Sequence, residues 1–197
     1  MSKDIDVKIS AVCKTCNERF FNTLQAPVEP FLKSTIPGST FELDSDHRKA
    51  LAAWTYKTAL LIPLASIRRT DWPRPIVEAC ARFYEKPRPP IGTRIWTGRY
   101  DLASSYPDLL SRVDYAGVTV RRRNVMYEGT QILIMVGNLI LVTVFWSDAA
   151  PDELPGEQRQ FPLSEFIRIW PVDPGIATWP PDRSVSYSDL PRLSTTR

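Results

Sequence analysis

Two apolar segments on either side of Gly137-Asn138 constrain the fold of this chain more than any other feature. Ile132 to Val136 and Leu139 to Phe145 are apolar at nearly every position. A two-residue connection with glycine first suits the type II′ turn of an antiparallel hairpin. Because strands that lack polar positions are covered on both faces, we expect this hairpin to lie inside a sheet, with helices on its outer face.

An alternation of apolar and polar residues predicts three further strands after residue 90, at 94–100, 116–122 and 166–170. Trp96 and Trp170 fall within these strands and are expected in the core. From residue 173 onward the chain is rich in proline, serine and aspartate. We expect this tail to wrap the surface or fray, and Trp179 to be exposed beside its prolines.

The first half of the chain has helical periodicity instead. A short amphipathic helix follows Asn17, a further helical turn starts at Pro27, and Pro37-Gly38 ends it. Longer helices are predicted at 45–61 and 75–84. The predicted apolar face of the first of these comprises Ala50, Leu51, Trp54, Thr58 and Leu61, and that of the second comprises Ile76, Ala79, Cys80 and Phe83. The proline-rich segment 86–90 is expected to be an extended connector, since proline fixes φ and lacks an N–H.

These patterns predict an α+β protein. The chain is expected to open with a strand, a knuckle and a helix, which together make half of a treble clef. These elements and two further helices pack on a mostly antiparallel β-sheet. We divide the chain into a strand-knuckle-helix segment (1–36), a helical segment (37–90), an antiparallel β region (91–172) and a C-terminal tail (173–197).

Cys13 and Cys16 make the only cluster that suggests a specific chemistry. Residues 5–12 alternate as a half-buried strand does, and Asn17 after the second cysteine is a good N-cap. A strand, Cys-x-x-Cys and a helix form the second half of a treble-clef zinc site, because two thiolates at this spacing reach one ion. Redox use of the pair is the alternative, but the βαβ context that it requires is missing.

A structural zinc ion needs two more ligands, and His47 and Cys80 are the remaining candidates in the chain. Cys80 lies on the apolar stripe of a helix, where a buried free cysteine is the simpler explanation. His47 lies in the first turn of a helix and is better explained as solvated. A closed zinc site within this chain is therefore not favoured, and a partner chain is another source of ligands.

Charge and length set broader limits. The 197 residues carry a formal net charge of +3, which is compatible with a nucleic-acid partner without indicating one. Three cysteines do not make a disulfide framework. The N-terminus lacks the apolar region of a signal peptide, and the run 132–146 is shorter than the ~20 residues of a membrane helix. We expect a soluble cytoplasmic protein without a membrane partner.

Basic side chains are the candidates for contacts with nucleic-acid phosphates. Arg121, Arg122 and Arg123 follow a predicted strand, and Arg68 and Arg69 follow the helix 45–61. Lysine and arginine supply most of the non-specific affinity for nucleic acids. The simpler interpretation is a solvated run of charge at the end of each element. Lys57, at the edge of a helix face, is another candidate phosphate contact, although a lysine stem that covers apolar surface also explains it.

The sequence resembles a family of HNH endonuclease-like proteins from actinobacteria and their phages. The resemblance starts with Cys13-x-x-Cys16-Asn17 and continues with Leu51-Ala-Ala-Trp54-Thr-Tyr-Lys57-Thr-Ala59. It extends through Pro90-Ile-Gly-Thr-Arg-Ile-Trp96, Gly137-Asn138-Leu-Ile-Leu, Ile169-Trp170-Pro171 and Trp179-Pro-Pro181, and so covers most of the chain. It implies a DNA endonuclease that uses Mg²⁺, Mn²⁺ or Ni²⁺, and it matches Asn17 to the catalytic asparagine that orients the general base.

The departures from the family pattern argue against catalysis by this chain alone. HNH hydrolysis needs a base to activate water and a divalent ion to stabilise charge on the phosphate. The family's hairpin with the base histidine and the first cysteine pair has no counterpart before Cys13, because no histidine or earlier cysteine occurs there. Glu18-Arg19-Phe20-Phe21 also replaces the family's Asn-Gly-Trp-Met.

Three accounts of this pattern stay open. The chain is a degenerate relative kept as a nucleic-acid or protein interaction module, or its missing half lies on another segment, or a partner chain completes the zinc site. We take the first, a non-catalytic module, as the leading hypothesis. A metal-dependent endonuclease completed by a missing segment or partner is the alternative, and a structural or phage-host interaction protein without nucleic-acid binding is the second alternative.

Overall fold

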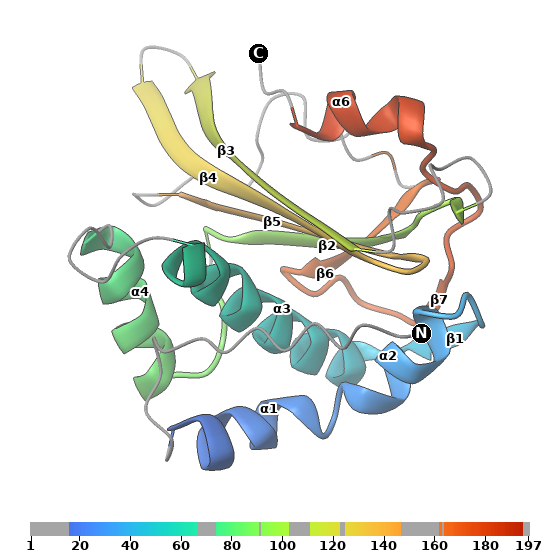
Figure 1. The fold of residues 1–197 in the computed structure, drawn as a ribbon, viewed down its shortest axis with the longest axis horizontal. Helices are drawn as coiled ribbons and strands as arrows, with labels where there is room; N and C mark the ends of the chain where they lie inside the picture. The colour runs from blue at the N-terminus through green and yellow to red at the C-terminus, as the bar shows by residue number, and fades with distance from the viewer. Residues whose placement is uncertain are drawn as a thin grey trace.

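The computed structural model describes residues 16–66, 74–90, 92–102, 111–122, 125–146, 162 and 164–194. The fold is mixed α+β, as the sequence predicts, with helices on one side of a mostly antiparallel sheet and the C-terminal segment on the other (Figure 1). Within the described residues, no helix combines the length and the apolar character that a membrane crossing requires.

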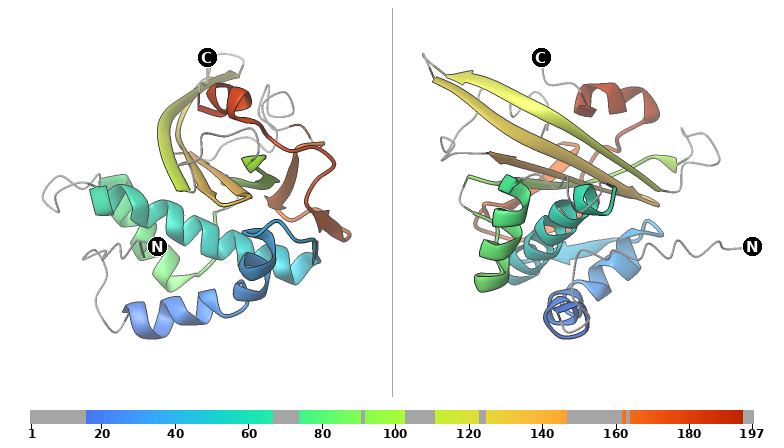
Figure 2. Two further views of the ribbon diagram at one scale, coloured as in Figure 1. Left: turned by 45° about the vertical axis from the view of Figure 1, so that its right-hand side comes forward. Right: turned by 60° about the vertical axis from the view of Figure 1, so that its left-hand side comes forward.

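The main sheet contains β2 (Arg94–Arg99), β3 (Ser111–Arg122), β4 (Val125–Val136), β5 (Leu139–Trp146) and β6 (Phe166–Trp170). Their order is β3-β4-β5-β2-β6, and each neighbouring pair is antiparallel. All the strands predicted after residue 90 are confirmed, although β3 and β4 begin earlier than predicted. The hairpin turn is confirmed too, with Gly137 at a φ of 55°. Figure 2 shows that the far ends of β3 and β4 curve away from the helices.

A small second sheet pairs β1 (Phe41–Leu43) with β7 (Ala177–Trp179) in antiparallel register. The sequence does not predict either strand, because three residues are too few to establish a period. The pairing draws Trp179 into the core, where it is fully buried and its indole N–H donates to the carbonyl of Gly98 at 3.3 Å. The expectation that Trp179 is exposed is therefore wrong.

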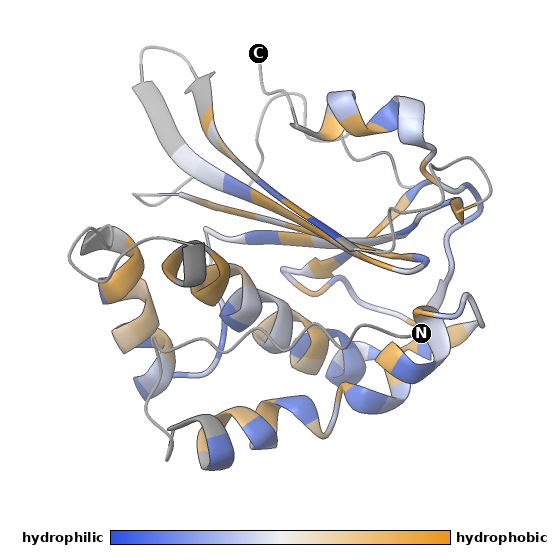
Figure 3. Cartoon of the chain, viewed as in Figure 1, coloured by the Kyte–Doolittle hydropathy of each residue, from blue (hydrophilic) through white to orange (hydrophobic). Residues whose placement is uncertain are grey.

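The helical layer begins with a π-helical turn, η1 (Cys16–Phe21), and continues through α1 (Asn22–Gln25) and α2 (Glu29–Thr35). It ends with α3 (Ser45–Ser66) and α4 (Arg74–Glu85). The helices predicted at 45–61 and 75–84 are confirmed, and α3 extends beyond its predicted end through Pro63. Figure 3 shows hydrophilic and hydrophobic residues alternating along α1 and α2, as expected for helices with one solvated side.

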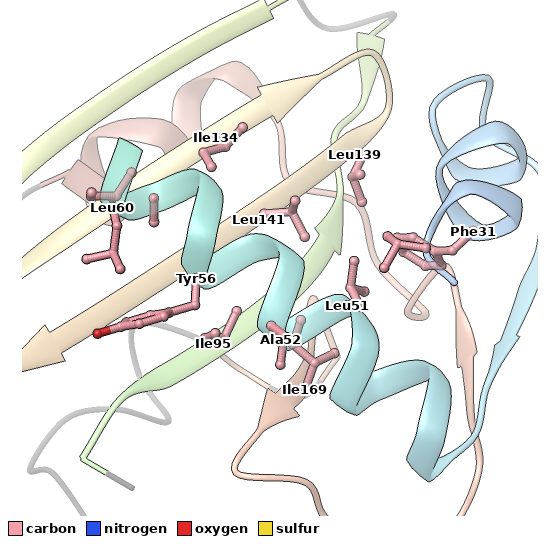
Figure 4. Close-up of a cluster of buried hydrophobic side chains, with 14 of the residues drawn as sticks. Phe31, Leu51, Ala52, Tyr56, Leu60, Ile95, Ile134, Leu139, Leu141 and Ile169 are labelled. Carbon is pink, nitrogen blue, oxygen red and sulfur yellow. The ribbon is translucent and has the colours of Figure 1, made fainter. Parts of the chain in front are cut away.

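The buried face of α3 differs from the predicted one. Of the residues predicted on the buried face, only Leu51 is buried. Ala52, Thr55, Tyr56, Ala59 and Leu60 are buried instead. Figure 4 shows Leu51, Ala52, Tyr56 and Leu60 in this position on α3. The difference arises because α3 lies between other elements, packing on α1 and α4 as well as on β5 and β6. Apolar residues occur on most of its circumference, so helical periodicity alone does not single out one face.

Both faces of the central hairpin are covered, as predicted. On the helix side, Ile132, Ile134, Leu139 and Leu141 join the cluster of Leu51, Tyr56 and Leu60 from α3. On the other side, Leu133, Met135, Ile140, Val142 and Val144 pack with Val185, Leu190 and Leu193. The last three belong to the tail, which contains η4 (Tyr187–Asp189) and α6 (Leu190–Ser194). The tail thus wraps the molecule as part of its core and does not fray within the described residues.

Candidate functional site

The cysteine knuckle lies partly outside the described residues, which start at Cys16. Cys13 is not among them. Cys16 and Asn17 open η1, so Asn17 lies inside the first helical turn and not at the N-cap position before it. Among the residues that the structure describes, no group of three or more His, Cys, Asp and Glu side chains gathers as a metal site would require.

His47 belongs to the start of α3. Its Nδ1 lies 3.0 Å from Oδ1 of Asp44, and its ring meets the Phe41 ring edge-on with 5.2 Å between centroids. The same Asp44 oxygen accepts the backbone N–H groups of Asp46 and His47 at 2.9 and 2.8 Å, which makes Asp44 the N-cap of α3. The backbone hydrogen bond from His47 lowers the pKa of Asp44. These contacts explain His47 as part of a helix cap.

Cys80 lies in the middle of α4 and packs partly buried against the core. Burial raises the pKa of its thiol to about 11, which opposes the thiolate form that binds metal. Cys80 is close enough to Tyr56 of α3 to influence the pKa of that phenol. Tyr56 is nine residues beyond His47 in α3, or roughly 13 Å along the helix axis at 1.5 Å per residue. His47 therefore lies at the start of α3, whereas Cys80 lies beside its middle.

Lys57 of α3 lies close to two aromatic rings. Its Nζ lies 5.0 Å from the centroid of Phe21 and 5.7 Å from that of Trp54, both within the range of cation–π attraction. Burial lowers the pKa of Lys57. Within the described part of the chain no carboxylate pairs with this ammonium group. Lys57 is thus a partly desolvated cation whose visible partners are aromatic faces.

Arg121 and Arg122 are the last two residues of β3. Arg123, Arg68 and Arg69 lie outside the described residues. β3 pairs with β4 up to Arg122 and Val125. The pairing of β4 with β5, in contrast, begins only at Gly129 and Trp146. The segments 119–122 and 125–128 therefore form a two-stranded ribbon, which we call the β-arm. Figure 2 shows it projecting beyond the rest of the sheet.

A groove of about 240 Å³ opens between α2, α3 and the β4–β5 hairpin. Its lining is entirely hydrophobic and consists of Leu32, Ile36, Trp54, Ile134, Val136, Leu139 and Leu141. The sequence does not predict this groove, because four separate elements contribute to it. Trp54, predicted on the buried face of its helix, is half-buried in the structure and lines this groove.

No family model matches this chain, and neither a curated protein nor a solved structure matches it.

Proposed function

We propose that this protein is a non-catalytic nucleic-acid-binding module, derived from an HNH-type nuclease, that contacts duplex DNA through the β-arm. The observation that carries this proposal is the pairing register, which leaves 119–122 and 125–128 without support from β5. The arm ends in Arg121 and Arg122, and the chain continues into Arg123. Two arginines thus lie at the end of a ribbon that extends beyond the core.

The dimensions of the β-arm suit a groove of duplex DNA. Four residues per strand at ~3.3 Å each give a reach of roughly 13 Å, and paired strands lie ~4.8 Å apart. The major groove of B-DNA is about 12 Å wide and 8.5 Å deep and admits a two-stranded β-ribbon. A-form RNA has a deep, narrow major groove that a ribbon does not enter. The arm therefore favours duplex DNA over duplex RNA.

The contacts of His47 support binding without cleavage. It is the only histidine in the sequence, and HNH chemistry uses histidine as its general base. Its ring lies between Asp44 and Phe41 at the cap of α3, away from the β-arm on the other layer of the molecule. Hydrolysis by this chain alone would thus lack its usual base.

Fluorescence anisotropy with a labelled DNA duplex tests the proposal across a range of salt concentrations. We expect salt-dependent binding, because arginines that neutralise phosphates release counterions. The variant Arg121→Gln/Arg122→Gln/Arg123→Gln should bind more weakly and lower the slope of log K against log salt by about one per lost phosphate contact. The control variant Arg82→Gln/Arg88→Gln/Arg183→Gln removes the same charge at exposed positions outside the arm and should bind like the wild type.

Two outcomes would contradict this proposal. A flat titration would exclude nucleic-acid binding, and equal losses in both triple variants would show that net charge, not the arm, determines affinity. Incubation of a supercoiled plasmid with the purified chain and Mg²⁺, Mn²⁺ or Ni²⁺ tests the nuclease alternative. Nicking that persists through repeated purification would overturn the non-catalytic assignment.

A further inference from the structure

The groove between α2, α3 and the β4–β5 hairpin has the composition of a site for an apolar group. All seven lining side chains are hydrophobic, and Val136 at its rim is 38% exposed. An apolar surface that is left open to water gains free energy when a ligand covers it. At about 30 Å³ for each water-sized group, a volume near 240 Å³ accepts roughly eight such groups. This is less room than a drug-sized ligand requires.

A cation lies beside this apolar lining. Trp54 contributes to the groove, and Nζ of Lys57 lies 5.7 Å from the centroid of its ring. The same ammonium group lies 5.0 Å from the centroid of the Phe21 ring. No carboxylate within the described residues neutralises the Lys57 ammonium group. Partial burial lowers the pKa of Lys57, because removing the positive charge from water costs free energy. An anion beside Lys57 would offset that cost.

We propose that this groove binds a free, single-chain amphiphilic carboxylate of medium length. The alkyl chain lies along Trp54 and the hairpin residues, and the carboxylate pairs with Lys57. Octanoate, with eight carbons, matches the volume. This site lies on the helix side of the sheet and does not depend on the DNA-binding role proposed for the β-arm.

The test measures displacement of the fluorescent dye 1-anilinonaphthalene-8-sulfonate from the full chain by octanoate, and by 1-octanol, which has the same chain length without the charge. Isothermal titration calorimetry with octanoate gives the affinity directly. We expect saturable binding below the concentration at which octanoate forms micelles. Octanoate should bind more tightly than octanol by about tenfold or more, the usual contribution of a charged hydrogen-bonded pair.

Two variants separate the roles of the charge and the groove. Lys57→Met keeps an apolar stem of similar length and should abolish the preference for octanoate over octanol. Val136→Trp, at an exposed rim position, should obstruct the groove and weaken both ligands. Lys33→Met is the matched control, because Lys33 is exposed on α2 and pairs with Glu29 at 2.6 Å. Circular dichroism checks the fold of each variant, and Lys57→Gln replaces Lys57→Met if the latter does not fold.

Several results would overturn the proposal. These are the absence of saturable octanoate binding, equal affinities for octanoate and octanol in the wild type, and an unchanged preference in the Lys57 variant. Binding only to phosphatidylglycerol vesicles, with none to free octanoate, would assign the surface to membranes and would equally refute a site for a free carboxylate.

Discussion

At the scale of single residues, Tyr56 connects three elements and makes stability depend on pH. Its ring lies 5.5 Å from Phe83 of α4 and 6.2 Å from Phe145 of β5. Burial raises the pKa of its phenol from 10.0 to about 12. In the unfolded chain the phenol ionises near pH 10, whereas in the folded protein it stays neutral until about pH 12. The folded state therefore loses stability as pH rises through this interval.

We predict that Tyr56→Phe reduces this loss of stability. At pH 11 the phenol is ionised in the unfolded chain but neutral in the folded protein. The free energy of unfolding of the wild type should therefore be about 1 kcal/mol lower at pH 11 than at pH 8, whereas Tyr56→Phe has no phenol to ionise and should not show this decrease. Urea unfolding at both pH values measures the difference, with Tyr84→Phe as a control at an exposed position of α4. The shifts of Lys57 and Cys80 are present in all three proteins and cancel. An equal loss of stability between pH 8 and pH 11 in the wild type and in Tyr56→Phe would show that the Tyr56 phenol does not cause it.

At the scale of elements, the turn between β4 and β5 is the point where the helical layer meets the sheet. The backbone N–H of Asn138 donates to the carbonyl of Ile36, just after α2, at 3.0 Å, and Nδ2 of Asn138 donates to the same oxygen at 3.1 Å. Gly137 has a φ of 55°, and a Cβ added there would lie 2.6 Å from the same Ile36 oxygen. Both the positive φ and the close approach of the Ile36 carbonyl oxygen therefore disfavour any side chain at position 137.

Gly137→Ala should therefore destabilise the protein by about 2 kcal/mol or more, since a left-handed conformation and a backbone clash add together. Gly117→Ala in β3 is the matched control, because nothing lies within 4 Å of an added Cβ and φ is not positive. We expect this variant to be neutral or slightly stabilising. Urea unfolding at pH 7 measures both. A similar effect of the two substitutions would show that the contact with Ile36 does not restrict the turn.

Elements with a strong local signal are those that the sequence predicts correctly. The hairpin around Gly137 and the stripe of α4 depend on periodicity and turn chemistry within a few residues, and both are confirmed. The orientation of α3, the pairing of β1 with β7 and the burial of Trp179 depend on partners more than a hundred residues away in sequence or on several neighbours at once. The apolar groove also depends on several elements that meet only in the folded protein. The sequence singles out Lys57 but does not predict its contacts with two aromatic rings.

At the scale of the whole molecule, the C-terminal segment closes the face of the sheet that the helices leave uncovered. Val185, Leu190 and Leu193 are 2% exposed or less and pack with Leu133, Ile140 and Val142. The side chain of Gln131 in β4 donates through Nε2 to the carbonyl of Leu193, which fixes α6 to the sheet. A sheet that is apolar on both faces needs both covers, so the tail contributes to the stability of the entire domain.

Leu193→Ala should consequently reduce the free energy of unfolding by about 2–5 kcal/mol, as expected when a large side chain is removed from a packed core. Deletion of residues 184–197 removes all three anchors, each contributing roughly 1.5–3 kcal/mol through burial. That sum is comparable to the ~5–15 kcal/mol net stability of a typical domain, so the shortened chain should lose cooperative unfolding. Ile176→Ala, at a position 71% exposed, is the control and should change stability by less than ~0.5 kcal/mol. Cooperative urea unfolding of the shortened chain at an unchanged midpoint would show instead that the helical layer and the sheet form a stable unit without α6.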